Sequence, residues 1–360
     1  MRLHLVGGFL GSGKTTAIGA AARRLLDGGS RVGVVTNDQG QYLVDTLFFQ
    51  QANIPAVEVT GGCFCCNYED LETRLSQLQA AAQPEVVFAE SVGSCADMVA
   101  TVVKPLLRLR HTAAELTSFS VFVDARLLRL WLRDEELPFS DSVVYIFGKQ
   151  IEEAGLLVIN KIDLLPDAAL QETEALFRER FPGKAYRLQN SRQAGQVECW
   201  LEQIETGAAR LPSDSLQIDY NRYGDGEAQL AWLDERVTVQ FPQGQGRAVL
   251  LEWIETILAE LERRRWSAGH LKLLLQSPDG PVKLSITALG EPDWRAQLPA
   301  QLEDRQEILL NARVETSATD LRQIVNDALE KLRAAGRVEY TTAAIDSFHP
   351  GFPHPQYRLE

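Results

Sequence analysis

The residues best suited to chemistry lie near the start of the chain, in a glycine-rich stretch from Gly8 to Thr15. Its sequence, Gly-Phe-Leu-Gly-Ser-Gly-Lys-Thr, fits G-x-x-x-x-G-K-[ST], the phosphate-binding P-loop. Glycines let the backbone approach phosphate oxygens, and successive N–H groups then form an anion-binding cradle. Lys14 would contact the β- and γ-phosphates, and Thr15 would offer its hydroxyl to Mg²⁺. The nucleotide-binding residues predicted here are Gly8, Gly11, Ser12, Gly13, Lys14, Thr15 and Thr16.

Two acidic residues follow apolar segments that resemble buried strands. Glu90 ends the segment 85–90, which is the Walker B pattern, so its carboxylate is expected to reach Mg²⁺ or the attacking water. Asp38 follows the segment 31–36 and is a second candidate for that contact, although Asn, Asp and Gly at 37–40 equally favour a simple polar turn. Gly93 would let a backbone N–H approach the γ-phosphate. The catalytic candidates are therefore Lys14, Glu90 and Asp38.

A third motif, Asn-Lys-Ile-Asp at 160–163, follows the apolar segment 156–159. N-K-x-D in this position is the guanine-reading element of GTPases. Asp163 would accept hydrogen bonds from the guanine N1–H and exocyclic amine, which adenine cannot match. Lys161 would cover the base plane, and Asn160 would brace neighbouring loops. The loop 189–191 is a candidate for a last base-contacting segment.

Cysteines cluster in the loop that follows a short strand expected at 56–59. Cys63, Cys65 and Cys66 lie within four residues, after two glycines. Three thiolates this close can ligate one soft or borderline metal ion and leave a fourth position open, provided that the loop turns. The alternative is that they are small buried hydrophobes or redox-active thiols. The five histidines are scattered along the chain, and we expect them to be structural.

Strand and helix patterns alternate from residue 1 to about residue 210, which predicts a parallel sheet with helices on both faces. A linker is expected at 211–215. Beyond it, the order β-α-β-β-β-α predicts a smaller α+β domain with an antiparallel sheet. We therefore predict an α/β P-loop domain over residues 1–212 and an α+β domain over residues 213–360, with the segment 348–355 as an extended surface arm.

Composition narrows the class of function. The chain has 360 residues, 45% of them hydrophobic, and a formal net charge of −13. This acidic balance argues against non-specific binding to nucleic acid or to a membrane surface. No apolar run reaches transmembrane length, and the chain opens on a strand pattern rather than a signal peptide, so a cytoplasmic location is expected. Clustered cysteines in such a compartment indicate metal binding or catalysis rather than disulfides.

Taken in order, the five motifs resemble the CobW-like GTPases, which are related to HypB, UreG and the MeaB-type corrinoid chaperones. They read GGFLGSGKTT, NDQGQ, GGCFCC, ESVG and NKID. The resemblance implies a GTP-dependent metallochaperone in which the C-x-C-C motif is the metal-binding signature, and it covers most of the chain. One departure is that Gln39 and Gln41 replace an aromatic residue and an acid that are common in the family.

The resemblance implies GTP, Mg²⁺ and either Zn²⁺ or Co²⁺ as ligands, with Thr15 and Glu90 on Mg²⁺ and the three cysteines on the transition metal. A client metalloprotein or corrinoid enzyme is the expected partner, and a homodimer is one option for the oligomeric state. Neither nucleic acid nor a membrane is expected as a partner. Three alternatives stay open at this point: a GTPase chaperone of a corrinoid enzyme, a non-catalytic metal sensor or buffer, and, with less support, a small-molecule kinase.

Overall fold

The computed structural model describes residues 1–40, 44–109, 113–207, 211–278, 280–290 and 294–360. Gln41 therefore lies outside the described residues. The chain forms two compact units. The first contains Met1–Gln39, Asn53–Gly226 and Pro353–Glu360, and the second contains Gly40–Ala52 and Glu227–Phe352. The sequence analysis placed one domain boundary, at residue 212. In the structure, the chain passes between the two units four times.

The first unit is built on a seven-stranded sheet in the order β3-β2-β4-β1-β5-β6-β7. Every pairing in it is parallel, which confirms the predicted class of fold. The central strands are apolar and buried on both faces, as parallel strands covered by helices must be. The strands are β1 (Arg2–Gly8), β2 (Val32–Asn37), β3 (Ala56–Val59), β4 (Val86–Glu90), β5 (Glu115–Asp124), β6 (Leu156–Asn160) and β7 (Tyr186–Gln189).

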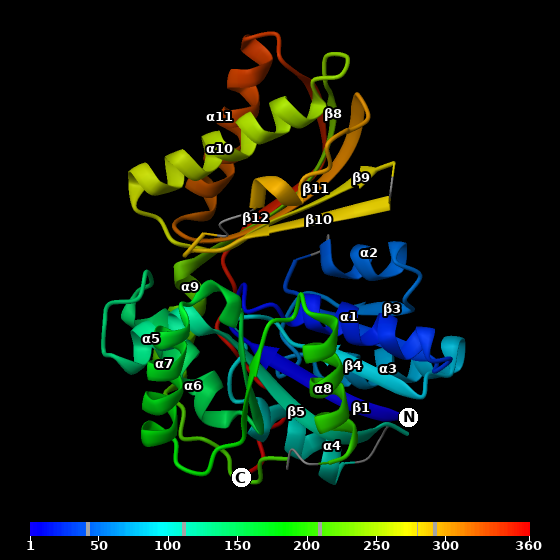
Figure 1. The fold of residues 1–360 in the computed structure, drawn as a ribbon, viewed down its shortest axis with the longest axis vertical. Coiled ribbons are helices and arrows are strands. Elements are labelled where there is room, and N and C mark those ends of the chain that lie inside the picture. The colour runs from blue at the N-terminus through cyan, green and yellow to red at the C-terminus, as the bar shows by residue number, and fades with distance from the viewer. Residues whose placement is uncertain (41–43, 110–112, 208–210, 279, 291–293) are drawn as a thin grey trace. The chain divides into compact units, whose positions relative to one another are not determined.

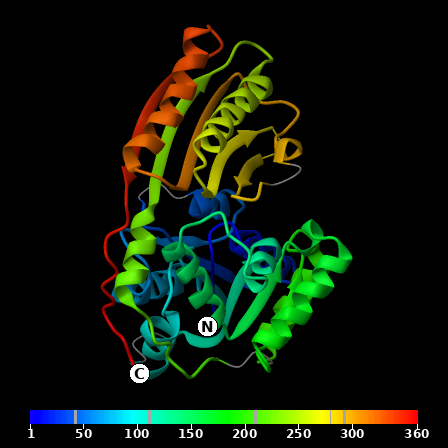
Figure 2. The same ribbon diagram turned by 90° about the vertical axis from the view of Figure 1, so that its left-hand side faces the viewer.

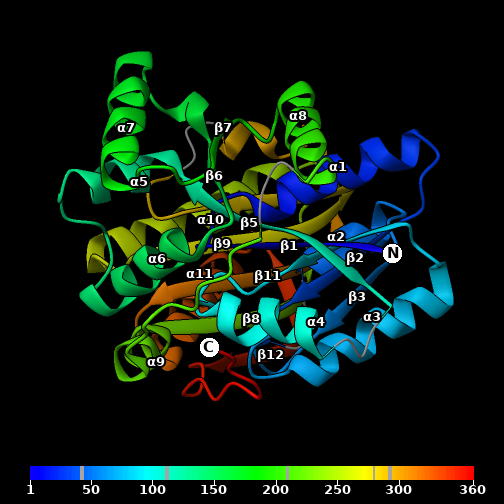
Figure 3. The same ribbon diagram turned by 90° about the horizontal axis from the view of Figure 1, so that it is seen from below.

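Helices cover both faces of this sheet, with α1 and α8 on one face and α3 and α4 on the other (Figures 1 and 3). Because the strands are all parallel, their carboxyl ends lie at one edge of the sheet, where the predicted motifs follow. The helices and short turns are α1 (Lys14–Asp27), α3 (Tyr68–Ala82), η1 (Val99–Val103), α4 (Lys104–Arg108), α5 (Ala125–Leu132), α6 (Asp141–Glu153), η2 (Ile162–Leu164), α7 (Asp167–Arg180), α8 (Ala194–Glu205) and α9 (Tyr220–Gln229). The helix α9 runs across the boundary into the second unit.

The second unit is a five-stranded antiparallel sheet in the order β10-β9-β11-β8-β12. Two amphipathic helices, α10 and α11, pack together on one face and close the unit's main apolar core (Figure 2). The elements are β8 (Leu230–Gln240), α10 (Gly246–Arg264), β9 (Ala268–Ser277), β10 (Gly280–Ile286), η3 (Trp294–Gln297), β11 (Arg305–Glu315), α11 (Ala318–Ala334) and β12 (Glu339–Phe348). The sequence predicted this unit's order of elements up to α11 and missed β12.

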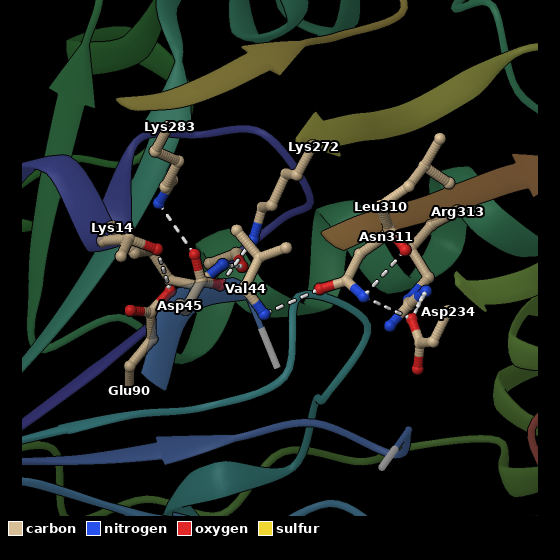
Figure 4. Close-up of polar contacts among 12 residues, drawn as sticks. Lys14, Val44, Asp45, Glu90, Asp234, Lys272, Lys283, Leu310, Asn311 and Arg313 are labelled. Carbon is tan, nitrogen blue, oxygen red and sulfur yellow. Dashed lines mark hydrogen bonds and ion pairs between the residues drawn. The ribbon is translucent and has the colours of Figure 1, made fainter. Parts of the chain in front are cut away.

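A helix from the N-terminal half completes the second unit. The helix α2 (Val44–Gln51) contacts β9, β10 and β11 of the antiparallel sheet. Asp45 forms ion pairs with Lys272 at 2.6 Å and Lys283 at 2.7 Å, and the backbone N–H of Val44 donates to Asn311 (Figure 4). Among the described residues, no helix is both long and apolar enough to cross a membrane.

Candidate nucleotide and metal site

The P-loop joins β1 to α1, and its glycines adopt conformations that other residues would resist. Gly8, Gly11 and Gly13 have φ angles of 125°, 71° and 94°. A Cβ on Gly8 would lie 2.1 Å from the Phe122 carbonyl oxygen, so only glycine fits beside β5. The Nζ of Lys14 donates to the Gly8 carbonyl at 2.7 Å, which places its charge over the loop. The loop thus has the backbone shape of an anion cradle, with a cation held at it.

A hydroxyl and a carboxylate meet beside the P-loop. Thr15 Oγ1 donates to Glu90 Oε1 at 2.9 Å, and both residues are buried. The register explains the contact, because β1 and β4 are neighbours and Val6 is paired with Glu90. Two such oxygens are suitable ligands for Mg²⁺, which binds through one or two protein groups together with phosphate oxygens.

Asp38 lies at the same edge of the sheet. It directly follows β2, in which Thr36 is paired with Glu90, and its backbone N–H donates to the Val59 carbonyl at 3.2 Å. The half-buried position of Asp38 fits either a polar turn or a contact to nucleotide and metal. Its role therefore stays a prediction.

Asn160 connects the guanine motif to the P-loop. Its Nδ2 donates to the Ser12 carbonyl at 2.8 Å, and its Oδ1 accepts from the Ser191 backbone N–H at 3.0 Å. The loop 189–191 is therefore tied to the motif that follows β6. Lys161 has a left-handed backbone with φ 59°, and the Asp163 side chain is exposed just beyond it. This arrangement leaves Asp163 accessible to a base.

Asp124 is a member of this site that our sequence reasoning did not single out. It ends β5, caps α5 by accepting from the Arg126 backbone N–H at 2.9 Å, and lies 3.4 Å from Lys161 Nζ. Burial alone would raise the pKa of Asp124, but hydrogen bonds from Arg126 and the charges of Lys161 and Arg126 lower it below its usual value. The signal was present in the sequence, because Asp124 ends an apolar strand as Glu90 does.

The three clustered cysteines converge as a metal site requires. The Sγ atoms of Cys63, Cys65 and Cys66 all lie within 4.8 Å of one another. A turn produces this convergence, because the backbone N–H groups of Cys66 and Asn67 both donate to the Cys63 carbonyl, at 3.0 and 2.9 Å. The sequence required such a turn for all three thiols to meet. Cys63 and Cys65 are buried, and Cys66 is half-buried.

Asn37, the last residue of β2, holds the cysteine loop. Its Nδ2 donates to the carbonyls of Val59 and Gly62 at 3.1 and 2.7 Å, and its Oδ1 accepts from the Phe64 N–H at 2.8 Å. The sequence placed Asn37 in a loop that either contacts the nucleotide and its metal or forms a simple polar turn. Its side chain links the loop that carries Asp38 to the loop that carries the thiols.

The surroundings of the thiols favour their protonated form. Hydrogen bonds from Cys63, Cys66 and Cys95 and burial raise the pKa of Cys65 well above its usual value. The hydrogen bond with Cys63, together with burial, raises the pKa of Cys66 to about 11. Because a metal binds thiolate rather than thiol, metal binding would release protons from this loop.

The end of the chain packs against the cysteine loop. The backbone N–H of Gln356 donates to the Cys65 carbonyl at 3.0 Å, and the ring of Tyr357 contacts that of Tyr68 with centroids 5.3 Å apart. Arg358 forms an ion pair with Asp97 at 2.8 Å. The expectation of a surface arm over 348–355 was therefore wrong in part, because Phe348 ends a strand and Pro353 is buried.

The comparisons with known proteins can be set against this geometry. Residues 2–186 match the family model described as "CobW/HypB/UreG, nucleotide-binding domain". The chain is 25% identical over 349 residues to the zinc chaperone YeiR of Escherichia coli, covering 88% of this chain and 99% of YeiR. It is 27% identical over 189 residues to the zinc chaperone CobW of a Sinorhizobium species, covering 46% of this chain but only 52% of that protein. Among solved structures, zinc-bound YjiA GTPase of E. coli is similar at 12% identity and a TM-score of 0.37, covering 91% of this chain and 98% of YjiA.

Proposed function

Because this chain belongs to the CobW/HypB/UreG family, we propose that it is a GTP-hydrolysing chaperone that binds Zn²⁺ and passes it to a client protein. The observation that carries the proposal is the convergence of three thiols in the same compact unit as a P-loop. Two similar proteins of the family are named zinc chaperones, which supports the same metal. Thiolates also accept Co²⁺, with lower affinity generally expected, so Zn²⁺ is the first choice.

The nucleotide part of the proposal assigns each residue a task. The P-loop amides and Lys14 bind the phosphates, and Thr15 and Glu90 hold Mg²⁺, which would neutralise charge on the β- and γ-phosphates. Asp163 selects guanine, while Asn160 and Lys161 shape the base site. Asp38 or Glu90 positions the attacking water, and Gly93 lets a backbone N–H approach the γ-phosphate. Catalysis is then a matter of position and charge, as is usual for phosphoryl transfer.

The metal is cargo in this proposal, bound by Cys63, Cys65 and Cys66 in exchange for their protons. The client is a metalloprotein that needs Zn²⁺, and the cytoplasm is the compartment in which reduced thiols of this kind persist. Hydrolysis of GTP would loosen the cysteine loop and allow transfer. A coordination position that opened on the metal at that stage would give a client ligand a place to attack.

The test is GTP turnover and Zn²⁺ binding by the purified full chain, compared with Cys63→Ser and Cys66→Ser. We expect one tightly bound Zn²⁺ per chain, a turnover that changes on adding Zn²⁺, and loss of both the binding and the response in the two variants. Cys199→Ser is the matched control, because Cys199 is an exposed thiol on α8. Equal Zn²⁺ binding by all four proteins would refute the metal assignment, and failure to hydrolyse GTP with or without metal would refute the catalytic one.

A further inference from the structure

A fourth thiol lies against the cysteine cluster, on a different loop. Cys95 Sγ is 3.9 Å from Cys65 Sγ, and the Cys63 thiol also interacts with Cys95. Cys95 is buried, and it follows β4 by five residues, beyond Glu90 and Gly93. A further sulfur neighbour is Met98, whose Sδ is 3.2 Å away. Cys95 therefore faces sulfur atoms, whereas a cysteine that only fills space would be expected to face carbon.

Three of the sulfur–sulfur distances suit a shared tetrahedral ion. With Zn–S bonds of about 2.3 Å, two thiolates on one tetrahedral Zn²⁺ lie about 3.8 Å apart. The Cys65–Cys95 separation of 3.9 Å, the Cys65–Cys66 separation of 3.7 Å and the Cys63–Cys66 separation of 3.5 Å all fall near this value. Cys63 and Cys65, at 2.6 Å, would have to open by about 1 Å to share the ion. Cys95 contacts Cys65 but does not lie within 4.8 Å of all three thiols of the trio. A shared ion would therefore draw Cys66 and Cys95 toward each other.

The loop that carries Cys95 is held in place. The side chain of Gln150, on α6, donates to the carbonyls of Gly93 and Cys95 at 3.0 and 2.9 Å. The Ala96 backbone N–H donates to the Tyr223 hydroxyl oxygen at 3.1 Å. A ligand on a loop fixed in this way has its position set before the metal arrives.

We propose that Cys95 is the fourth thiolate ligand of the zinc site, so that the bound ion is held by sulfur alone. This inference rests on the proposed function, because it assumes that Zn²⁺ binds the trio. Four protein ligands would make a closed site, which retains its ion better than a three-ligand site with an exchangeable position. Because Cys95 lies on the loop that follows Glu90, a nucleotide-dependent change that released the contacts of Gln150 and Tyr223 with this loop would withdraw the fourth ligand. Release of Zn²⁺ to a client would then begin when the Cys95 thiolate dissociates from the ion.

The test counts sulfur ligands on the intact chain. The purified protein is loaded anaerobically with one equivalent of Zn²⁺, and X-ray absorption at the zinc edge gives the number of sulfur neighbours. We expect an all-sulfur shell in the wild-type protein, one sulfur fewer in Cys95→Ser, and no change in Cys199→Ser. Competition with a chromophoric chelator should show that Cys95→Ser binds Zn²⁺ at least about tenfold more weakly, since even partners outside the ligand shell cost that much.

Two outcomes would overturn the inference: a wild-type shell that already contains a nitrogen or oxygen ligand in place of one sulfur, or equal Zn²⁺ affinity in Cys95→Ser and the wild type. Cys63→Ser separates this failure from failure of the proposed function, because it abolishes tight binding whether or not Cys95 is a ligand. If Cys63→Ser also bound normally, the proposed function itself would fail. The metal-free unfolding temperature of Cys95→Ser checks the fold, and the ligand count in the wild type decides the question if that variant is unstable.

Discussion

The Thr15–Glu90 contact gives a sharp prediction for one residue. If Glu90 holds Mg²⁺ or the attacking water, Glu90→Gln keeps the shape of the side chain and removes its charge. We expect kcat for GTP to fall about 100-fold, the lower end for loss of a general base or an equivalent contact. Single-turnover hydrolysis at saturating Mg²⁺ measures this. Glu85→Gln is the control, because Glu85 lies just before the same strand and its side chain is 48% exposed. Equal rates in the two variants would remove Glu90 from the mechanism.

A second prediction concerns the choice of base. Asp163→Asn replaces an acceptor with a group that also donates, so it loses the match to the guanine N1–H and amine. Two hydrogen bonds to a charged acceptor account for about 3 kcal/mol, so GTP should bind about 100-fold more weakly. The amide introduced by this substitution suits a carbonyl at position 2 of the base, so xanthosine triphosphate should bind better than GTP. Fluorescent-nucleotide titration measures both affinities.

The matched control for this prediction is Asp167→Asn. Asp167 is an exposed aspartate in the first turn of α7, a few residues from the guanine motif. It should leave both affinities unchanged. If Asp163→Asn kept the wild-type preference for GTP, the guanine assignment would be wrong.

At the scale of elements, the local sequence pattern of α2 did not predict that this helix belongs to the second unit. This helix spans Val44–Gln51. Its membership of the second unit depends on Asp45 meeting two lysines more than 200 residues away in the chain, and no local pattern reports such a contact. By contrast, α10 and α11 follow from a 3.6-residue apolar period that is visible locally.

The missed strand has a related cause. β12 is an edge strand, mostly half-exposed or exposed, with a register shift between Thr342 and Ala344. It therefore lacks the clean alternation that reveals a half-buried strand. Cys95 was overlooked in the same way, because it is 30 residues from Cys65 along the chain and only the fold brings the two together. The P-loop, the cysteine trio and the guanine motif were predictable because each is contiguous in sequence.

The ion pairs of α2 give a stability prediction. Asp45 is 15% exposed, and its partners Lys272 and Lys283 are 12% and 10% exposed. Asp45→Asn would remove the carboxylate that pairs with the two ammonium groups. We therefore expect the free energy of unfolding of the second unit to fall by about 3 kcal/mol. Urea unfolding followed by tryptophan fluorescence measures the change. The control is Asp70→Asn, whose surface pair with Arg74 should contribute less than about 0.5 kcal/mol.

The same residue predicts a dependence on pH. Burial would raise the pKa of Asp45, but the charges and hydrogen bonds of Lys272 and Lys283 hold it well below its usual value. A lowered folded-state pKa gives stability that is present above the unfolded pKa, about 3.9, and is lost as pH falls through the folded value. The difference in free energy of unfolding between the wild type and Asp45→Asn should therefore shrink by about 1 kcal/mol as the pH is lowered from 7 to 3. A difference that widened toward pH 3 would contradict this assignment.

At the scale of the whole molecule, the first unit places the cysteine loop beside the loops predicted to bind the nucleotide. Asn37 joins the end of β2 to the cysteine loop, and Asp38 follows it directly. The loop after β4 carries Glu90 at one end and Cys95 at the other. Parallel strands end at one edge of the sheet, so both connections are consequences of the fold. If a nucleotide orders either loop, we expect the free energy of metal binding to change with it.

Coupling of this kind is reciprocal, which makes it measurable from both sides. If bound GTP changes the Zn²⁺ affinity by some factor, bound Zn²⁺ must change the GTP affinity by the same factor, and we expect about tenfold, within the usual range for such coupling. Titrating a non-hydrolysable GTP analogue with and without Zn²⁺, and Zn²⁺ with and without the analogue, gives both factors. Asn37→Ala should bring the two factors toward one, whereas Asn326→Ala, at an exposed site on α11, should leave them unchanged. If the wild-type protein bound the GTP analogue equally well with and without Zn²⁺, there would be no coupling free energy between the two sites. The nucleotide could not then drive delivery of the metal.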